Sequence, residues 1–148
     1  MSLRNSSSSS IHGHILLVDD NVSGSSARKT VLEELGHRIH VAASGADALE
    51  QFSQHKYDLV VTDYKMPRMD GLELIGRLRK QTPDIPIVLI SGFVDTLGLN
   101  EATTGADSVI QKSANEVTHL VRAVNRLLRR KKPASAAAGR LKAKRQAG

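Results

Sequence analysis

Two adjacent aspartates, Asp19 and Asp20, directly follow an apolar run in the sequence LLVDDN. A carboxylate is well hydrated in the unfolded chain, so crowding two of them at the end of a buried strand costs free energy unless they bind something. Further along, the apolar run DLVVTD ends in Asp63, IVLIS ends in Ser91, and VIQK ends in Lys112. Carboxylates, a hydroxyl and an ammonium are the groups from which a metal-assisted phosphate site can be built.

Three carboxylates in one place repel one another, by roughly 4 kcal/mol for a pair about 4 Å apart at an effective dielectric constant of about 20. A hard divalent cation relieves this repulsion. Mg²⁺ takes oxygen ligands and is typically held by one or two carboxylates together with waters and phosphate oxygens. A carboxylate can also act as the nucleophile and form an aspartyl phosphate. The residue types therefore favour magnesium-dependent phosphoryl chemistry.

These side chains meet only if the fold brings their strands together. Short apolar runs alternate along the chain with segments of helical spacing, which predicts βαβ crossovers and a parallel sheet. In such a sheet the carboxyl ends of the strands share one edge, where open α/β folds bind ligands. The five expected strands cover Ile15–Val18, Arg38–Ala42, Leu59–Thr62, Ile85–Ile90 and Ser108–Ile110.

Apolar residues spaced three or four positions apart predict a helix after each strand. The second helix should begin at Ser44-Gly-Ala-Asp47, which has the form of a capping box. The fourth segment, Phe93 to Thr104, has an irregular pattern and contains Gly98, which predicts a short or mobile helix. The buried stripes expected for the other four are Ala27, Val31 and Leu35; Ala48, Leu49 and Phe52; Leu72, Ile75 and Leu78; and Val117, Leu120, Val121, Val124 and Leu127.

The charge is unevenly distributed along the 148 residues. Eight of the 21 basic residues and none of the 15 acidic ones follow Leu128, so residues 1–128 carry a formal charge of −2, against +6 for the chain. The basic character therefore belongs to a tail. We expect a polar, disordered leader over residues 1–12, one domain over 13–131 and a basic, flexible tail over 132–148.

Several functional classes are disfavoured by composition. The chain has no cysteine, so it has no disulfide framework and no thiolate metal site. No apolar run is long enough to cross a bilayer, and the serine-rich N-terminus lacks the apolar stretch of a signal peptide. These features predict a cytoplasmic protein without a membrane partner. The six histidines show no metal-ligand spacing, and His37 and His40 are interpreted as exposed or packing residues.

The sequence resembles the CheY-like receiver domains of two-component response regulators over about residues 13–130. The resemblance rests on Asp19-Asp20, on the segment DYKMPRMDG from Asp63 to Gly71, on Ser91-Gly92 and on Lys112. It implies a flavodoxin-like, doubly wound (βα)5 fold with a five-stranded parallel sheet of order 2-1-3-4-5. Fewer than twenty residues follow the expected fifth helix, so we expect no output domain in this sequence, which is either a single-domain regulator or a fragment of a larger protein.

The resemblance assigns a role to each acid of the site. Asp63 would be the phosphoacceptor. Asp20 and Asp63 would ligate Mg²⁺ directly, together with the backbone carbonyl of Lys65, and Asp19 would act mainly through metal-bound water. The cofactor expected is therefore Mg²⁺.

In the same comparison Ser91 would hydrogen-bond the phosphoryl group and Lys112 would pair with a phosphoryl oxygen. The chain would take phosphate from a sensor histidine kinase or a histidine phosphotransferase, switch conformation and control a downstream effector protein. It would not be an enzyme beyond catalysing its own phosphorylation and dephosphorylation. Whether it forms a homodimer stays open.

Two positions depart from the family. The aromatic residue usually found three positions before the lysine is Val109 here, and the proline usually found after the lysine is Ser113. A non-proline cis bond costs about 2.5–4 kcal/mol, so a trans bond after Lys112 is expected. Since valine cannot act as a switching ring, we expect output to use ordering of Phe93–Thr104, or Phe93 itself.

The sequence is also compatible with three alternative functions. The basic tail could bind nucleic acid, but it lacks aromatic residues for stacking and any reading helix. A magnesium-dependent aspartyl-phosphate phosphohydrolase would usually carry Asp-x-Asp after its first strand, where this chain has Asp19-Asp20-Asn21. A receiver-like domain that no longer takes phosphate is disfavoured by the complete set of acids.

Overall fold

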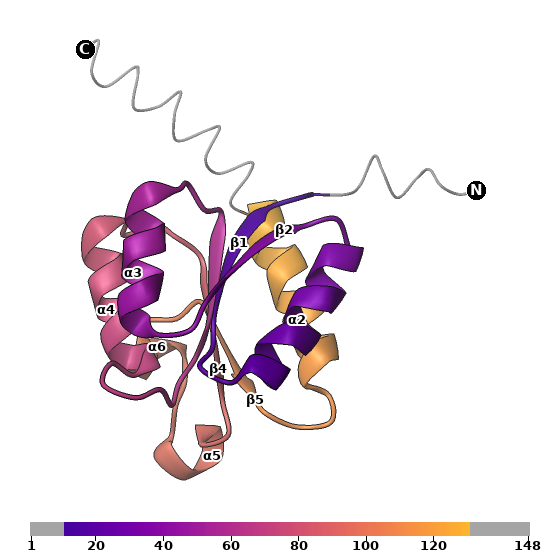
Figure 1. Ribbon diagram of the computed structural model, residues 1–148. Coiled ribbons are helices and arrows are strands. Elements are labelled where there is room, and N and C mark those ends of the chain that lie inside the picture. Colours follow the sequence, from indigo (N-terminus) through magenta and orange to yellow (C-terminus); the bar gives the residue numbers. More distant parts are fainter. Residues whose placement is uncertain (1–10, 131–148) are drawn as a thin grey trace, which may run out of the picture.

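The computed structural model describes residues 11–130 (Figure 1). Five parallel strands form one sheet in the order β2-β1-β3-β4-β5, which confirms the predicted fold and strand order. The strands are β1 (His14–Val18), β2 (Arg38–Ala42), β3 (Leu59–Asp63), β4 (Ile87–Ser91) and β5 (Ser108–Gln111). The helices are α2 (Val22–Glu34), α3 (Gly45–Gln54), α4 (Gly71–Gln81), α5 (Val94–Leu97), α6 (Glu101–Thr104) and a C-terminal helix over 116–130.

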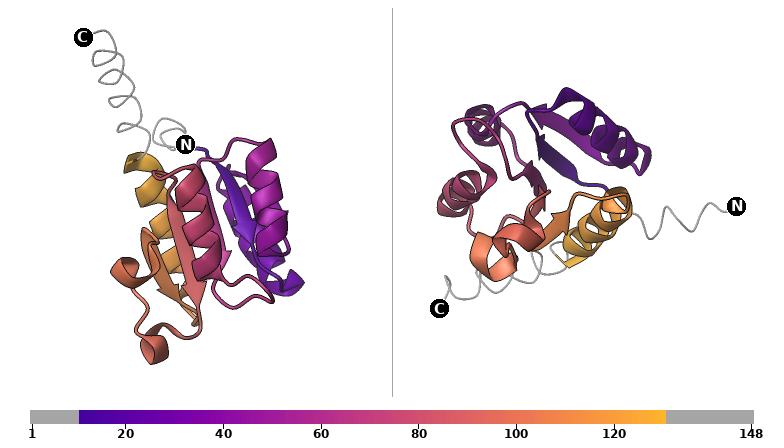
Figure 2. Two further views of the ribbon diagram at one scale, coloured as in Figure 1. Left: turned by 90° about the vertical axis from the view of Figure 1, so that its left-hand side faces the viewer. Right: turned by 90° about the horizontal axis from the view of Figure 1, so that it is seen from below.

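Helices cover both faces of the sheet, and the strand residues alternate between the two layers (Figures 1 and 2). Ile15 and Leu17 pack in the cluster formed with α2 and the C-terminal helix, whereas Leu16 and Val18 pack toward α3 and α4. All four are fully buried. This burial explains why β1, β3 and β4 read as continuous apolar runs.

The buried face of α2 differs from the predicted one. Its buried residues are Ser25, Arg28 and Leu32, not the apolar stripe of Ala27, Val31 and Leu35, which was wrong. Leu35 is the C-cap of the helix and is 43% exposed. The prediction counted apolar residues only, whereas the helix is rotated to bury an arginine.

The segment after β4 is also more broken than expected. Instead of one short helix it forms two single turns, α5 and α6, separated by Gly98, whose φ of 64° is left-handed. Asn100 caps α6 by accepting from the N–H of Thr103, and the Thr103 hydroxyl accepts from the N–H of Asn100. Glycine at a positive φ ends the first turn at little steric cost.

In α4 and the C-terminal helix, the buried residues differ from the predicted apolar stripes at a few positions. In α4, Leu74 is buried with Ile75 and Leu78, while Leu72 is only partly buried. Val117 is 39% exposed. The C-terminal helix instead buries Leu120, Ala123, Val124, Leu127 and Leu128. Most of the predicted leader and all of the predicted tail lie outside the described residues. None of the described helices is long and apolar enough to cross a membrane.

His37 is a packing residue at the end of β1 farthest from the acids. It is 5% exposed, and its Nδ1 accepts from the N–H of Gly13 at 3.1 Å. Burial, with a smaller contribution from the charge of His12, lowers the pKa of His37 below its usual 6.5. The imidazole is therefore neutral in the folded protein over a wider pH range than in the unfolded chain.

This shift predicts a loss of stability in mild acid. Below the unfolded pKa of 6.5 the unfolded chain binds a proton that the folded protein does not, so stability falls until the pH passes the lower folded pKa. The variant His37→Asn, which keeps an acceptor and does not titrate, should lose less free energy of unfolding between about pH 7.5 and about pH 5 than the native protein. Urea unfolding at both pH values measures this, and equal losses would contradict the assignment.

Candidate functional site

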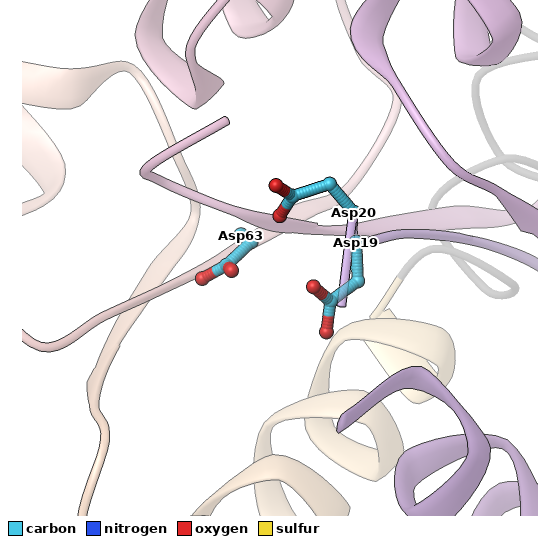
Figure 3. A group of neighbouring side chains, drawn as sticks. All are labelled: Asp19, Asp20 and Asp63. Atoms are coloured by element: carbon cyan, nitrogen blue, oxygen red, sulfur yellow. The ribbon is translucent and has the colours of Figure 1, made fainter. Parts of the chain in front are cut away.

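The three predicted acids meet at the carboxyl edge of the sheet. The pairing of Val18 with Thr62 across β1 and β3 places the next residues, Asp19 and Asp63, side by side. One carboxylate oxygen from each of Asp19, Asp20 and Asp63 lies within 4.8 Å of the others, and Figure 3 shows the carboxylates facing a common space. No second cluster of this kind occurs in residues 11–130.

The other predicted residues reach the same place from β4 and β5. Ser91 is the last residue of β4, and the N–H of Lys112 donates to the carbonyl of Ser91 just beyond β5. A single pocket is lined by five of the six predicted site residues: Asp20, Asp63, Lys65, Ser91 and Lys112. Asp19 is 3% exposed and does not line this pocket, although one of its carboxylate oxygens lies within 4.8 Å of those of Asp20 and Asp63. The parallel sheet therefore brings these side chains together, as their positions at or near the ends of strands predicted.

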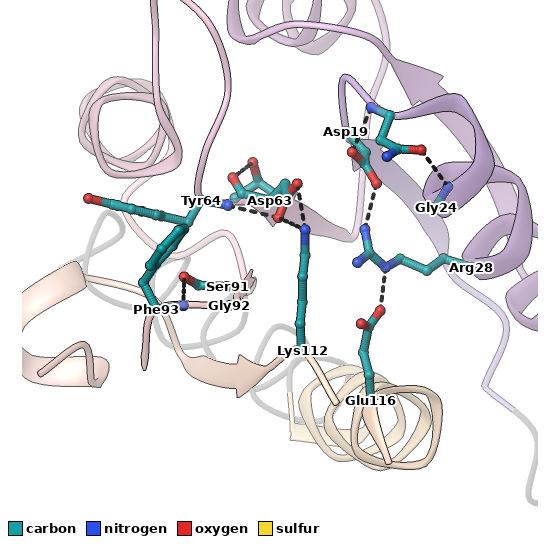
Figure 4. A network of polar contacts seen from close by, with 12 residues as sticks. Asp19, Gly24, Arg28, Asp63, Tyr64, Ser91, Gly92, Phe93, Lys112 and Glu116 are labelled. Carbon is teal, nitrogen blue, oxygen red and sulfur yellow. Dashed lines mark hydrogen bonds and ion pairs between the residues drawn. The ribbon is translucent and has the colours of Figure 1, made fainter. Parts of the chain in front are cut away.

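Asp63 is buried beside a lysine. The carboxylate is 4% exposed, and the Nζ of Lys112 lies 3.0 Å from Oδ1 and 3.1 Å from Oδ2 (Figure 4). Burial raises the pKa of Asp63 above its ordinary value, and the charge of Asp19 adds to the increase, while Lys112 and Arg28 oppose it. The surroundings of Asp63 therefore disfavour an unbalanced negative charge on its carboxylate and favour a nearby cation.

Asp19 is paired with an arginine that the sequence analysis missed. Its Oδ2 accepts from Nη1 of Arg28 at 2.7 Å, and its Oδ1 accepts from the N–H of Asn21 at 2.8 Å. The Nε of Arg28 donates to Glu116 at 2.6 Å, at the start of the C-terminal helix. The one signal in the sequence was that Arg28 stands four residues before Leu32, in register with the true buried face of α2.

Ser91 and Phe93 also line the pocket. Ser91 is 1% exposed, and its Oγ accepts from the N–H of Phe93 at 2.9 Å. Phe93 is 38% exposed and meets Tyr64 edge-on with 6.4 Å between ring centroids, and the Nζ of Lys65 lies 5.4 Å from the Phe93 centroid. The direct-ligand role of the Lys65 carbonyl stays a prediction.

The two departures from the family pattern lie in β5 and directly after Lys112. Val109 is partly buried against the core on the α3 and α4 side, and its N–H donates to Glu101 at 3.0 Å. Cis peptide bonds are absent from residues 11–130, so the bond from Lys112 to Ser113 is trans as expected.

The loop after Asp63 fits tightly onto the end of β3. Gly71 donates its N–H to the carbonyl of Tyr64 at 2.7 Å, and Asp70 caps α4 by accepting from the N–H of Glu73. A Cβ at position 71 would lie 2.5 Å from the carbonyl oxygen of Asp63 and 2.9 Å from Leu89. The close approach of α4 to the strand end therefore requires glycine.

Comparison with known proteins agrees with this geometry. A family model described as response regulator receiver domain matches residues 15–125. Response regulator MprA of Mycobacterium leprae is 34% identical over 125 residues, covering 83% of this chain and 54% of the relative. The gliding motility regulatory protein of Myxococcus xanthus is 32% identical, covering 76% of this chain and 15% of the relative.

Solved structures show the same likeness. The receiver domain of the Francisella response regulator 1452 superimposes with a TM-score of 0.74 at 32% identity, covering 81% of this chain and 99% of that one. Response regulator protein TrrA of Thermotoga maritima, solved in complex with Mg²⁺-BeF, gives a TM-score of 0.70 at 34% identity, covering 77% of this chain and 97% of that one.

The chain belongs to the response regulator receiver domain family. It is a receiver domain of two-component signalling with an acidic pocket of Asp19, Asp20 and Asp63. It spans about half of the length of MprA and less of several other curated relatives.

The packing at Gly71 yields a prediction with an internal control. Gly71→Ala should lower the free energy of unfolding by about 1–3 kcal/mol, because the methyl group overpacks the backbone at Asp63. Gly76→Ala in the same helix, where nothing lies within 4 Å of the added carbon, should raise it by about 0.5–1 kcal/mol. Denaturant unfolding of the two variants tests this, and equal effects would contradict the close approach.

Proposed function

We propose that Asp63 accepts a phosphoryl group from the phosphohistidine of a sensor histidine kinase or a histidine phosphotransferase. The observation that carries the proposal is the buried carboxylate of Asp63, held by Lys112 in one pocket with Asp20 and Ser91. A carboxylate oxygen of Asp63 forms the new bond to phosphorus as the bond from phosphorus to the imidazole nitrogen breaks. The electron pair stays on that nitrogen, and water later hydrolyses the acyl phosphate.

The residues present fit Mg²⁺. Carboxylate oxygens from three aspartates within 4.8 Å of one another are the hard donors this ion prefers. Asp20 and Asp63 would hold it directly with the carbonyl of Lys65, and Asp19 would accept hydrogen bonds from its waters. Bound there, the ion would neutralise charge on the carboxylates and the phosphoryl oxygens.

Lys112 and Ser91 would contact the phosphoryl group on Asp63. Once Asp63 carries a phosphoryl group, its carboxylate can no longer hold the lysine as it does now, and the Nζ of Lys112 turns to a phosphoryl oxygen. The hydroxyl of Ser91, which now only accepts, donates to another. These contacts exist in one conformation only, so they shift the population toward it and toward a downstream effector.

The chain acts on itself in this scheme and is not a multiple-turnover enzyme. The phosphohydrolase alternative gains no support from the site, whose nucleophile candidate lies at the end of β3 and not after β1. Nucleic-acid binding by the tail concerns residues outside the described range. A cytoplasmic location follows from the proposed partner and remains part of this proposal.

Labelling with acetyl phosphate and Mg²⁺ tests the assignment. The native chain should gain one acid-labile phosphoryl group, and Asp63→Asn should gain none, because an amide oxygen is not a nucleophile of this kind. Asp95→Asn, which changes an exposed acid in α5, is the matched control and should label normally. Labelling that survives Asp63→Asn would refute the role of Asp63.

The route of output is tested separately. Amide exchange in Phe93–Thr104 should slow when beryllofluoride and Mg²⁺ are added, because Ser91 and Phe93 link the pocket to α5 and α6. Lys112→Ala should still be labelled at Asp63 but should show little of this protection. Unchanged exchange in the native chain would exclude the α5–α6 segment as the responding element.

A further inference from the structure

Arg28 occupies an unusual place for an arginine. It lies on the buried face of α2 between Ser25 and Leu32 and is 5% exposed. Arginine is almost never buried to this degree unless it is paired. Here one guanidinium is held by two acids from distant parts of the chain, Asp19 after β1 and Glu116 in the C-terminal helix (Figure 4).

The first turn of α2 is shaped around this pair. A Cβ at Gly24 would lie 2.9 Å from Oδ2 of Asp19 and 3.9 Å from Nη1 of Arg28. The other oxygen of Asp19 is held by the N–H of Asn21. Asp19 is therefore fixed from two sides, and both the helix start and the arginine determine where its carboxylate lies.

We propose that Arg28 is a positioning residue that sets the charge of the acidic pocket for Mg²⁺ and couples its occupancy to the C-terminal helix through Glu116. The inference rests on the proposed magnesium site. Of the three carboxylates, that of Asp63 is balanced by Lys112 and that of Asp19 by Arg28, which leaves Asp20 without an ion pair to any residue of 11–130. Arg28 thus weakens the attraction of the pocket for a cation and keeps Asp19 out of direct coordination.

The coupling follows from competition for one carboxylate. A divalent cation near Asp19 weakens the electrostatic attraction between that carboxylate and Arg28. The guanidinium then interacts more strongly with Glu116. The coupling is reciprocal. A partner that displaces Glu116 leaves Arg28 paired with Asp19 only, and this stronger pairing weakens cation binding at the pocket. The C-terminal helix and the metal therefore influence each other through a contact between residues 88 positions apart.

Calorimetric titration of the full 148-residue chain with Mg²⁺ measures the affinity that tests the inference. Two variants should change this affinity in opposite directions. Arg28→Met should tighten binding about tenfold, because it removes a cation beside the pocket. Glu116→Gln should weaken binding several-fold, because it removes the acid that shares Arg28. The controls Arg77→Met and Glu73→Gln make the same charge changes in an exposed ion pair of α4 and should leave the affinity within about twofold of native.

The gain in melting temperature on addition of Mg²⁺ is a readout that a merely structural arginine would not change. Arg28→Met leaves Asp19 buried without its cation, so it should melt lower than native without Mg²⁺ and gain more than native when Mg²⁺ is added. An equal loss with and without Mg²⁺, at native affinity, would overturn the inference. If Arg28→Met does not fold, the Mg²⁺ affinity of Glu116→Gln alone tests the inference. An affinity equal to that of the native chain would overturn the inference.

Magnesium binding by the native chain separates a failure of the proposed function from a failure of this inference. A native chain that binds no Mg²⁺ contradicts the proposed function and this inference together. A native chain that binds Mg²⁺ with the same affinity as both variants contradicts this inference only and leaves the role of Asp63 intact.

Discussion

The site depends on the crowding of three carboxylates at the tips of two neighbouring strands. Asp19 and Asp63 are both nearly excluded from water, so their charges cannot be stabilised by solvent. Two cations make the arrangement tenable, Lys112 at 3.0 Å from Asp63 and Arg28 at 2.7 Å from Asp19. The charges are not fully balanced, because Asp20 has no such partner among the described ion pairs. The remaining negative charge can attract a metal ion.

The sheet provides the rigidity that this crowding requires. Continuous apolar strands are covered on both faces, and their parallel register delivers the last residue of each strand to one edge. The backbone ladder continues past the strands, with Asp19 donating to Ala42 and Lys112 donating to Ser91. Asp63 and Ser91 are the last residues of their strands, and Asp19 and Lys112 directly follow theirs, so these functional side chains stand on hydrogen-bonded backbone.

Much of this could be predicted from local patterns. Strand positions, strand order and the convergence of Asp19, Asp20, Asp63, Ser91 and Lys112 follow from the alternation of elements and from a family resemblance. The buried face of α2 could not be predicted, because the burial of Arg28 depends on Glu116, 88 residues later. Nor does an irregular apolar pattern distinguish one short helix from the two single turns around Gly98.

A receiver without the usual switching ring needs another path from pocket to surface. We propose two, one through Ser91 and Phe93 to the α5–α6 segment and one through Arg28 to the C-terminal helix. Both begin at the same pocket, so its occupancy is the central claim. A crystal structure of the full chain with Mg²⁺ and beryllofluoride tests it most directly. The account predicts beryllium on a carboxylate oxygen of Asp63 with the metal ion bound by Asp20 and Asp63; an ion bound elsewhere, with Asp63 unmodified, would contradict it.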